Sequence, residues 1–280
     1  MRFKWLMGSV LVAMIVSATL VPAQAPGLQT LELGTGPTVV LVPGLGASRT
    51  DWLPTVKRLK DHFHCVMVEI PGQGSSPMPD PFSLQAAAGM LDAVVAKQKA
   101  DSTIIVGCGV GASLALISAS AHPDHQRGVL LVDTFFKSPL QITDQQRDGM
   151  VQFIDENYDT FLHMAFRQMG RDSAESARLF AMITAVPPAT VKGYTREMIS
   201  MDSNRDFKNL TSPVLLAFTD HLWKPAMTWG ACTRRVGLED STRVSGVRIN
   251  NAGSMVMKDQ PDTLAAMITA FAAKGYAAKK

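Results

Sequence analysis

One short segment of the chain combines the residue types and spacing of a catalytic turn. The apolar run 103–106 is followed by Gly107-Cys108-Gly109-Val110-Gly111 and then by more small residues. A nucleophile elbow has this layout, in which a buried strand, a sharp turn and a helix present a serine in the pattern G-x-S-x-G. Here the third position is Gly109, which has no side chain to attack a substrate. The turn is therefore predicted without its nucleophile.

The elements that position this turn alternate in type along the chain. Strand and helix patterns that alternate predict an α/β fold, a mostly parallel sheet with helices on both faces. Ser83 is placed to cap the second helix. We expect strands at 28–33, 38–42, 65–70, 103–106, 129–133, 213–218 and 246–249, and helices at 50–63, 83–97 and 261–273.

The alternation stops between about residues 138 and 210, where helical patterns alone are found. They cover 144–156, 160–168, 173–184 and 189–201, and Thr143 is placed to cap the first. Helices inserted between two strands predict a cap over the carboxyl edge of the sheet, where open α/β sheets bind ligands. We expect a few of its apolar side chains to line a cavity, among Phe161, Met164, Phe166, Met169, Phe180 and Met182.

The first residues have the pattern of a secretory signal peptide. Arg2 and Lys4 precede the apolar run 6–20, and small residues follow at 21–25. We predict a signal peptide over residues 1–23 and a periplasmic or secreted domain over 24–280. Without Arg2 and Lys4 the 27 basic residues fall to 25 against 24 acidic ones, so the mature net charge is about +1. This balance predicts no nucleic-acid partner and no stable membrane association after cleavage.

The chain has three cysteines, an odd number for an exported protein. Cys65 begins one expected strand and Cys108 ends another, which places them too far apart for a disulfide. We expect buried free thiols, because a free cysteine behaves as a small apolar residue. A bridge between Cys65 and Cys232 stays open at this point.

In this order, the motifs resemble those of the α/β-hydrolase superfamily, specifically its small capped esterase- and lactonase-like members. The resemblance covers nearly the whole mature chain. Residues 39–48 resemble the family's oxyanion loop, with Pro43 where histidine is usual, and residues 69–76 resemble its D-x-P-G-x-G-x-S turn. His122-Pro123 lies where the family has a helix end. Ala252-Gly253-Ser254 with Gln260-Pro261 resembles the family's closing G-H…E-x-P stretch.

The resemblance implies a nucleophile, an acid and a base in this chain order. The nucleophile position is Gly109 and the base position is Ser254, whose hydroxyl cannot accept a proton as an imidazole does at neutral pH. The acid position lies nearer Leu222 by counting, with Asp220 two residues earlier. The glycine in the elbow is also similar to that of the NDRG family, whose members have this fold without a working triad.

The resemblance also implies that the backbone N–H groups of Leu45 and Val110 bind an oxyanion. A helix N-terminus at the turn favours anionic or carbonyl oxygen as well. We therefore predict a non-catalytic hydrolase-like protein, without cofactor or metal, that binds a small apolar ligand with a carbonyl or carboxylate end. The residues expected to bind it are Gly44, Leu45, Val110 and Ser254.

Other readings stay open. A divergent, serine-independent esterase or lactonase would use Asp220, His221 or water, with His163 and Cys108 as further candidates for rescue. Asp133, at a strand end, would replace the acid or cap local backbone. The segment Gly107–Ala112 also fits the dinucleotide pattern G-x-G-x-x-[G/A], with Asp133 about twenty residues later for the ribose. Two strand–helix units before that motif and the cap after it weigh against this last reading.

Overall fold

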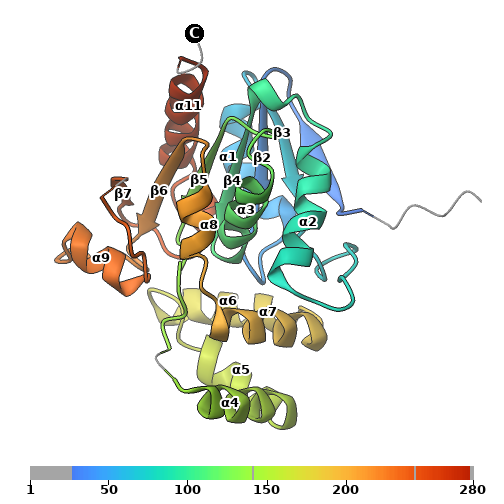
Figure 1. Cartoon of the computed structure of the whole chain (residues 1–280), viewed down its shortest axis with the longest axis vertical. Coiled ribbons are helices and arrows are strands. Elements are labelled where there is room, and N and C mark those ends of the chain that lie inside the picture. The colour runs from blue at the N-terminus through green and yellow to red at the C-terminus, as the bar shows by residue number, and fades with distance from the viewer. Residues whose placement is uncertain (1–26, 141, 243, 278–280) are drawn as a thin grey trace, which may run out of the picture.

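Seven strands form a single sheet in the computed structural model, which describes residues 27–140, 142–242 and 244–277 (Figure 1). The predicted signal peptide lies outside these residues. Within them, no helix is both long enough and apolar enough to span a membrane. The strands are β1 (Thr30–Leu33), β2 (Thr38–Val42), β3 (His64–Val68), β4 (Thr103–Cys108), β5 (Gly128–Val132), β6 (Val214–Thr219) and β7 (Gly246–Ile249).

The order of the strands is β1-β3-β2-β4-β5-β6-β7, and each pair is parallel except the edge pair β1 and β3. Val42 pairs with Gly107, and Cys108 pairs with Val132. This register brings the carboxyl ends of β2, β4 and β5 side by side. The three strands are buried throughout, as strands covered on both faces are, which explains their continuous apolar sequences.

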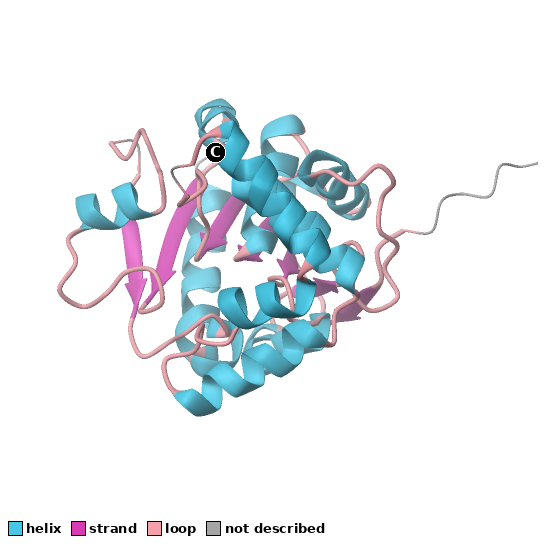
Figure 2. Cartoon of the chain, turned by 90° about the horizontal axis from the view of Figure 1, so that it is seen from below, coloured by secondary structure: helices cyan, strands magenta, loops and turns pink. Residues whose placement is uncertain are grey.

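Helices cover both faces of the sheet (Figure 2). Side chains alternate between two cores, so that Val40 and Val42 of β2 belong to one and Val39 and Leu41 to the other. The first core is covered by α2 (Leu84–Val95), α3 (Val110–Ala121), α8 (Asn204–Asn209) and α9 (Trp229–Arg235). The second is covered by η1 (Arg49–Trp52), α1 (Leu53–Leu59), α10 (Val256–Asp259) and α11 (Pro261–Ala277), while η2 (Ala100–Ser102) leads into β4.

Four helices between β5 and β6 form the cap, which lies below the sheet in Figure 1. They have an apolar cluster of their own, with Ile154, Ile183 and Val191 in its centre. The predicted N-cap Thr143 accepts a hydrogen bond from the N–H of Gln146 at 3.3 Å. The four are α4 (Asp144–Glu156), α5 (Tyr158–Phe166), α6 (Ser173–Thr184) and α7 (Pro188–Ser200).

The predicted elements are all present, with three differences. The helix expected at 50–63 is a 3₁₀ turn followed by α1, because Pro54 favours a helix start at that point. The cap ends earlier than residue 210, since α8 packs on α3 and buries Phe207 against Phe136. The short helices α8, α9 and α10 were not expected from the sequence.

All three cysteines are buried free thiols, as predicted. The bridge between Cys65 and Cys232 is excluded, because Cys65 lies in the core on one face of the sheet and Cys232 in the core on the other. Burial raises the pKa of each of these two thiols to about 11.

Candidate functional site

The turn between β4 and α3 has the geometry of an elbow. Gly109 has φ 57° and ψ −123°, which a residue with a side chain adopts only under strain. A Cβ on Gly107 would lie 2.4 Å from the carbonyl oxygen of Gly111, and one on Gly111 would lie 2.4 Å from that of Pro43. The glycines at both sides are therefore required by close backbone contact, which explains the small-residue pattern of this segment.

Space for a side chain exists at the nucleophile position itself. A Cβ built on Gly109 would have its nearest neighbour, the Cα of Gly44, at 3.8 Å. This is an ordinary van der Waals separation. The pocket is therefore not closed over Gly109, and what is missing there is the hydroxyl.

Two backbone N–H groups lie beside this turn. Val110 is the first residue of α3, and Leu45 lies in the loop after β2; both line the cavity together with Gly44. In the part of the chain that the structure describes, neither N–H has a hydrogen-bond acceptor. The first N–H groups of a helix have no acceptor within it, so Val110 keeps a donor for a ligand.

Gln73 holds the loop that contains Leu45. Its side-chain oxygen accepts a hydrogen bond from the N–H of Gly46 at 2.6 Å, and its amide donates to the carbonyl of Ala47 at 3.0 Å. Gln73 is only 4% exposed, so these bonds are shielded from water. The sequence signals the turn that carries Gln73 but not this role, because the two loops are distant along the chain.

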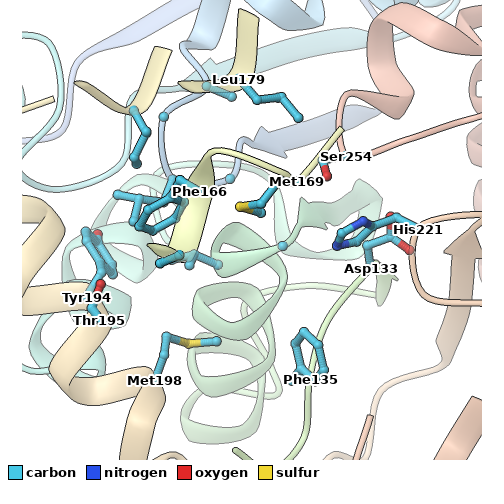
Figure 3. Close-up of a pocket in the computed structure, with 18 of the residues that line it drawn as sticks. Asp133, Phe135, Phe166, Met169, Leu179, Tyr194, Thr195, Met198, His221 and Ser254 are labelled. Carbon is cyan, nitrogen blue, oxygen red and sulfur yellow. The ribbon is translucent and has the colours of Figure 1, made fainter. Parts of the chain in front are cut away.

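The cavity next to the turn has a volume of about 550 Å³ and lies between the sheet and the cap. Figure 3 shows His221 and Asp133 together on one side of it, with Tyr194 and Thr195 on the other. No lysine or arginine is among the described residues that line it. The large aliphatic, methionine and phenylalanine side chains that the cap contributes to its lining are Met150, Phe161, Phe166, Met169, Leu179, Met182, Ile183, Met198 and Ile199.

Four of the six cap residues singled out in the sequence line this cavity, and two do not. Met164 is 75% exposed, and Phe180 instead has its ring 4.7 Å from that of His163. His163 is itself exposed and does not reach the cavity. His163 and Met164 are neighbours on the exposed face of α5, so His163 is excluded as a rescuing base.

Ser254, at the base position, lines the cavity close to the elbow. Its hydroxyl is buried, and no described residue forms a hydrogen bond with it. Its backbone carbonyl accepts a weak hydrogen bond from the thiol of Cys108 at 3.7 Å. A buried hydroxyl without a partner is uncommon, and this one would have to turn into the cavity to contact a ligand.

Neither position proposed for the acid fits that role. Asp220 is turned toward Arg248, at 2.5 Å, and accepts a hydrogen bond from the N–H of Asn251 at 2.7 Å; it does not line the cavity. Leu222 is buried and contributes an apolar wall. Counting from the strand could not reveal this, because the direction of Asp220 depends on its partner in β7.

His221 and Asp133 are the imidazole and the carboxyl group among the described residues that line the cavity. Burial lowers the pKa of His221, and the positive charges of Lys224 and Arg235 lower it further, so the ring is neutral at pH 7. Asp133 accepts hydrogen bonds from the N–H of Thr219, at 2.7 Å, and from its hydroxyl. Burial raises the pKa of Asp133 to about 6.

The hydrogen bonds of Asp133 test two interpretations of this residue from the sequence, that it replaces the acid or caps local backbone, and that it binds the ribose of a dinucleotide. Both carboxylate oxygens are engaged by Thr219, so this residue fixes local backbone between β5 and β6. The carboxylate is oriented by these bonds toward β6 and not toward a ribose, which argues against the dinucleotide reading of Gly107–Ala112.

Cys108 does not rescue the missing nucleophile. Its side chain is 3% exposed and packs in the core on the α1 and α11 side of the sheet. Burial raises the pKa of its thiol, and the negative charge of Asp133 raises it further. Nucleophilic cysteines need the opposite, a lowered pKa and exposure.

The cap is fastened near the base position by an ion-pair network. Glu175 of α6 is 3% exposed and accepts a hydrogen bond from the guanidinium of Arg171 at 2.8 Å. Arg171 also contacts Asp259 at 3.1 Å and donates to the carbonyl of Asn251 at 2.9 Å. A Cβ on Gly253 would lie 2.4 Å from Oε1 of Glu175, so a side chain at this position would displace the carboxylate from the network.

Comparisons with known proteins agree with this geometry. Residues 39–267 match the model of the alpha/beta hydrolase family. A pimeloyl-[acyl-carrier protein] methyl ester esterase of Pseudoalteromonas atlantica is 28% identical over 60% of this chain and 68% of its own. The protein of the same name from Vibrio vulnificus is 27% identical over 65% of this chain and 74% of its own. Namesakes from Neisseria meningitidis are matched at 35% identity over about a third of their length.

Solved structures share the fold at low sequence identity. A hydrolase from Oleispira antarctica has a TM-score of 0.70 and 16% identity, covering 87% of this chain and 94% of its own. A thermophilic esterase from Thermogutta terrifontis has a TM-score of 0.70 and 20% identity, covering 89% of this chain and 94% of its own. At such identities the likeness establishes the arrangement of elements and leaves the chemistry to the residues of the site.

Proposed function

This chain belongs to the alpha/beta hydrolase family, and we propose that it is a non-catalytic member that binds a small, mostly apolar ligand through a carbonyl or carboxylate end. The observation that carries the proposal is the elbow at Gly109. The turn, the cavity and the N–H donors are present there, while the hydroxyl that would attack an ester is not. Ser254 leaves the base role vacant as well.

The composition of the cavity supports an apolar ligand. Its volume of about 550 Å³ lies within the range of small-molecule sites, and methionine and aromatic side chains dominate its cap side. Methionines adapt to the shape of flexible apolar chains. The relatives are named for a pimeloyl methyl ester, which is an acyl chain with a carbonyl end. An acyl chain of medium length is therefore the ligand class that we favour.

The polar end of the ligand would lie at the elbow. The N–H groups of Leu45 and Val110 donate hydrogen bonds, and the N-terminus of α3 favours partial or full negative charge. The hydroxyl of Ser254 and the neutral ring of His221 offer further contacts. A positively charged end would be repelled by the N-terminus of α3, and the acidic side chain of the lining, Asp133, already accepts two hydrogen bonds from Thr219.

Titration calorimetry with three probes of equal chain length tests this proposal. Octanoate and methyl octanoate should bind the purified chain with one site each, while octylamine should bind at least about tenfold more weakly at pH 7, because its ammonium group cannot accept a hydrogen bond. Methyl octanoate should be recovered unchanged. Tighter binding of octylamine, or hydrolysis of methyl octanoate above background, would overturn the proposal.

A second candidate function is a serine-independent hydrolase. The observation that favours it is His221, a neutral imidazole in the cavity next to Asp133, which could accept a proton from a water molecule. An enzyme of this kind would turn over activated esters and lose that activity in His221→Ala. The binder would show only background rates with both forms.

A further inference from the structure

Three side chains with metal-binding chemistry gather far from the elbow. Asp92 lies on α2, His122 directly follows the end of α3, and His125 lies in the loop before β5. One ligand atom from each lies within 4.8 Å of the others. None of the three is among the described residues that line the cavity, so this cluster belongs to a separate part of the molecule.

The local sequence brings the two histidines together. The N–H of His122 closes the last turn of α3 onto Ser118 at 3.0 Å. Pro123 and Asp124 then form a turn in which the N–H of His125 donates to the carbonyl of His122 at 3.2 Å, and proline at the second position suits such a turn. The two imidazole rings stack with their centroids 4.9 Å apart and an angle of 6° between their planes.

Asp92 reaches this pair from the neighbouring helix α2. Its Oδ1 lies 2.9 Å from Nδ1 of His125, and its Oδ2 lies 3.7 Å from Nε2 of His122. Ligand atoms around tetrahedral zinc are about 3.4 Å apart, given metal–ligand bonds of about 2.0–2.1 Å. The Asp92–His125 separation is already below this value, whereas His122 would have to turn out of the ring stack to direct its lone pair at the same ion, and its side chain, 49% exposed, has room to turn.

One side of the cluster is buried and the other is exposed to water, an arrangement that suits a bound ion. Asp92 is 8% exposed, so its carboxylate is held in place by the surrounding core. The side chain of His122 is 49% exposed, which leaves the outer side of the cluster open to water. Three protein ligands and water complete the four-coordinate shell that zinc adopts.

We propose that Asp92, His122 and His125 bind a divalent transition-metal ion such as Zn²⁺. Two imidazoles and one carboxylate suit zinc and its neighbours, whereas Mg²⁺ and Ca²⁺ prefer oxygen ligands alone. The ion would occupy the position of the hydrogen between Nδ1 of His125 and the carboxylate of Asp92, and the neutral ring would carry that hydrogen on Nε2 instead. It joins the end of α2 to the end of α3 and stabilises the folded chain, because the ligands are brought together only there.

The test uses the purified chain without a histidine tag, titrated with Zn²⁺ and separately with Mg²⁺. Zn²⁺ should bind with a stoichiometry of one and raise the melting temperature, and Mg²⁺ should do neither. Asp92→Asn and His122→Ala should each weaken Zn²⁺ binding by at least about 10- to 100-fold, the loss that follows even when an outer partner of a metal ligand is removed.

His64→Ala provides the matched control. His64 also contacts a carboxylate, Glu32, at 3.0 Å, but this pair is no part of a three-ligand group among the described residues. Its loss should leave Zn²⁺ affinity unchanged. His122 is exposed, so its replacement tests the site even if Asp92→Asn folds poorly. Absence of saturable Zn²⁺ binding, or equal affinity in His122→Ala and the unaltered chain, would overturn the proposal and leave an ion-free carboxylate–histidine bridge.

Discussion

Replacing Val110 with proline removes one N–H donor from the elbow and leaves the helix intact. Val110 is the first residue of α3, a position at which proline is favoured because its missing N–H has no acceptor within the helix. The preceding Gly109 has ψ −123°, outside the helical region that a following proline disfavours. The variant Val110→Ala serves as control, because it removes the branched side chain and keeps the N–H.

The size of the effect follows from the hydrogen bond that is lost. A bond from an N–H to a charged carboxylate contributes about 1.5–3 kcal/mol, and the dissociation constant of octanoate should rise about 10- to 150-fold in Val110→Pro. A bond to a neutral ester carbonyl contributes about 0.5–1.5 kcal/mol, so that of methyl octanoate should rise only about 2- to 10-fold. Val110→Ala should change both much less.

Titration calorimetry of the three proteins measures these constants, and thermal unfolding checks that the proline variant is folded. The reasoning is refuted if Val110→Pro and Val110→Ala bind octanoate with equal affinity. That result would mean that the N–H at the start of α3 does not contact the ligand.

Four other predictions concern the surroundings of the cavity. Cys108 should resist iodoacetamide in the native chain, because it is 3% exposed and burial raises its pKa; rapid labelling found by mass spectrometry would contradict its placement. Burial raises the pKa of Asp133 to about 6, so the folded chain keeps a proton that the unfolded chain releases above about pH 4. The unfolding free energy in urea should therefore fall by about 3 kcal/mol between about pH 4 and about pH 6 because of this group. This fall should be absent in Asp133→Asn. If the unaltered chain and Asp133→Asn show the same dependence of unfolding free energy on pH, the pKa of Asp133 is not raised. Glu175→Gln should lower the unfolding free energy by roughly 1–3 kcal/mol, because Arg171 loses a buried charged partner; unchanged thermal unfolding would mean that the network does not fasten the cap. Gly109→Ser should lower the unfolding free energy by about 1–3 kcal/mol through backbone strain, without a steric clash. If this variant failed to fold, the turn would lack the space described.

The fold was predictable because its strands are short apolar runs separated by helices of clear period. Residues 38–42 and 246–249 form strands at the predicted bounds, and α4 and α6 also begin and end as expected. The cap was predictable from the interruption of the alternation. The short helices α8, α9 and α10 were not, since four to seven residues are too few to show a helical period.

The backbone conformation of the candidate site was predictable from the sequence, whereas the orientation of most of its side chains was not. The glycine pattern around Gly109 indicated the turn, and Ser254 lies in the cavity as its motif implied. The orientations of Asp220, His221 and His163 follow from partners in other elements, which spacing along the chain cannot indicate. The clamp formed by Gln73 depends on contacts between distant loops in the same way.

The central claim is that this chain keeps the scaffold and cavity of its family but not the acyl-transfer chemistry. The most direct test is hydrolysis of p-nitrophenyl butyrate by the purified chain, measured beside the double variant Gly109→Ser/Ser254→His. We predict that the unaltered chain stays at the background rate and that the double variant exceeds it, since a positioned base contributes about 10²- to 10⁴-fold. Turnover by the unaltered chain that disappears in His221→Ala would contradict the claim.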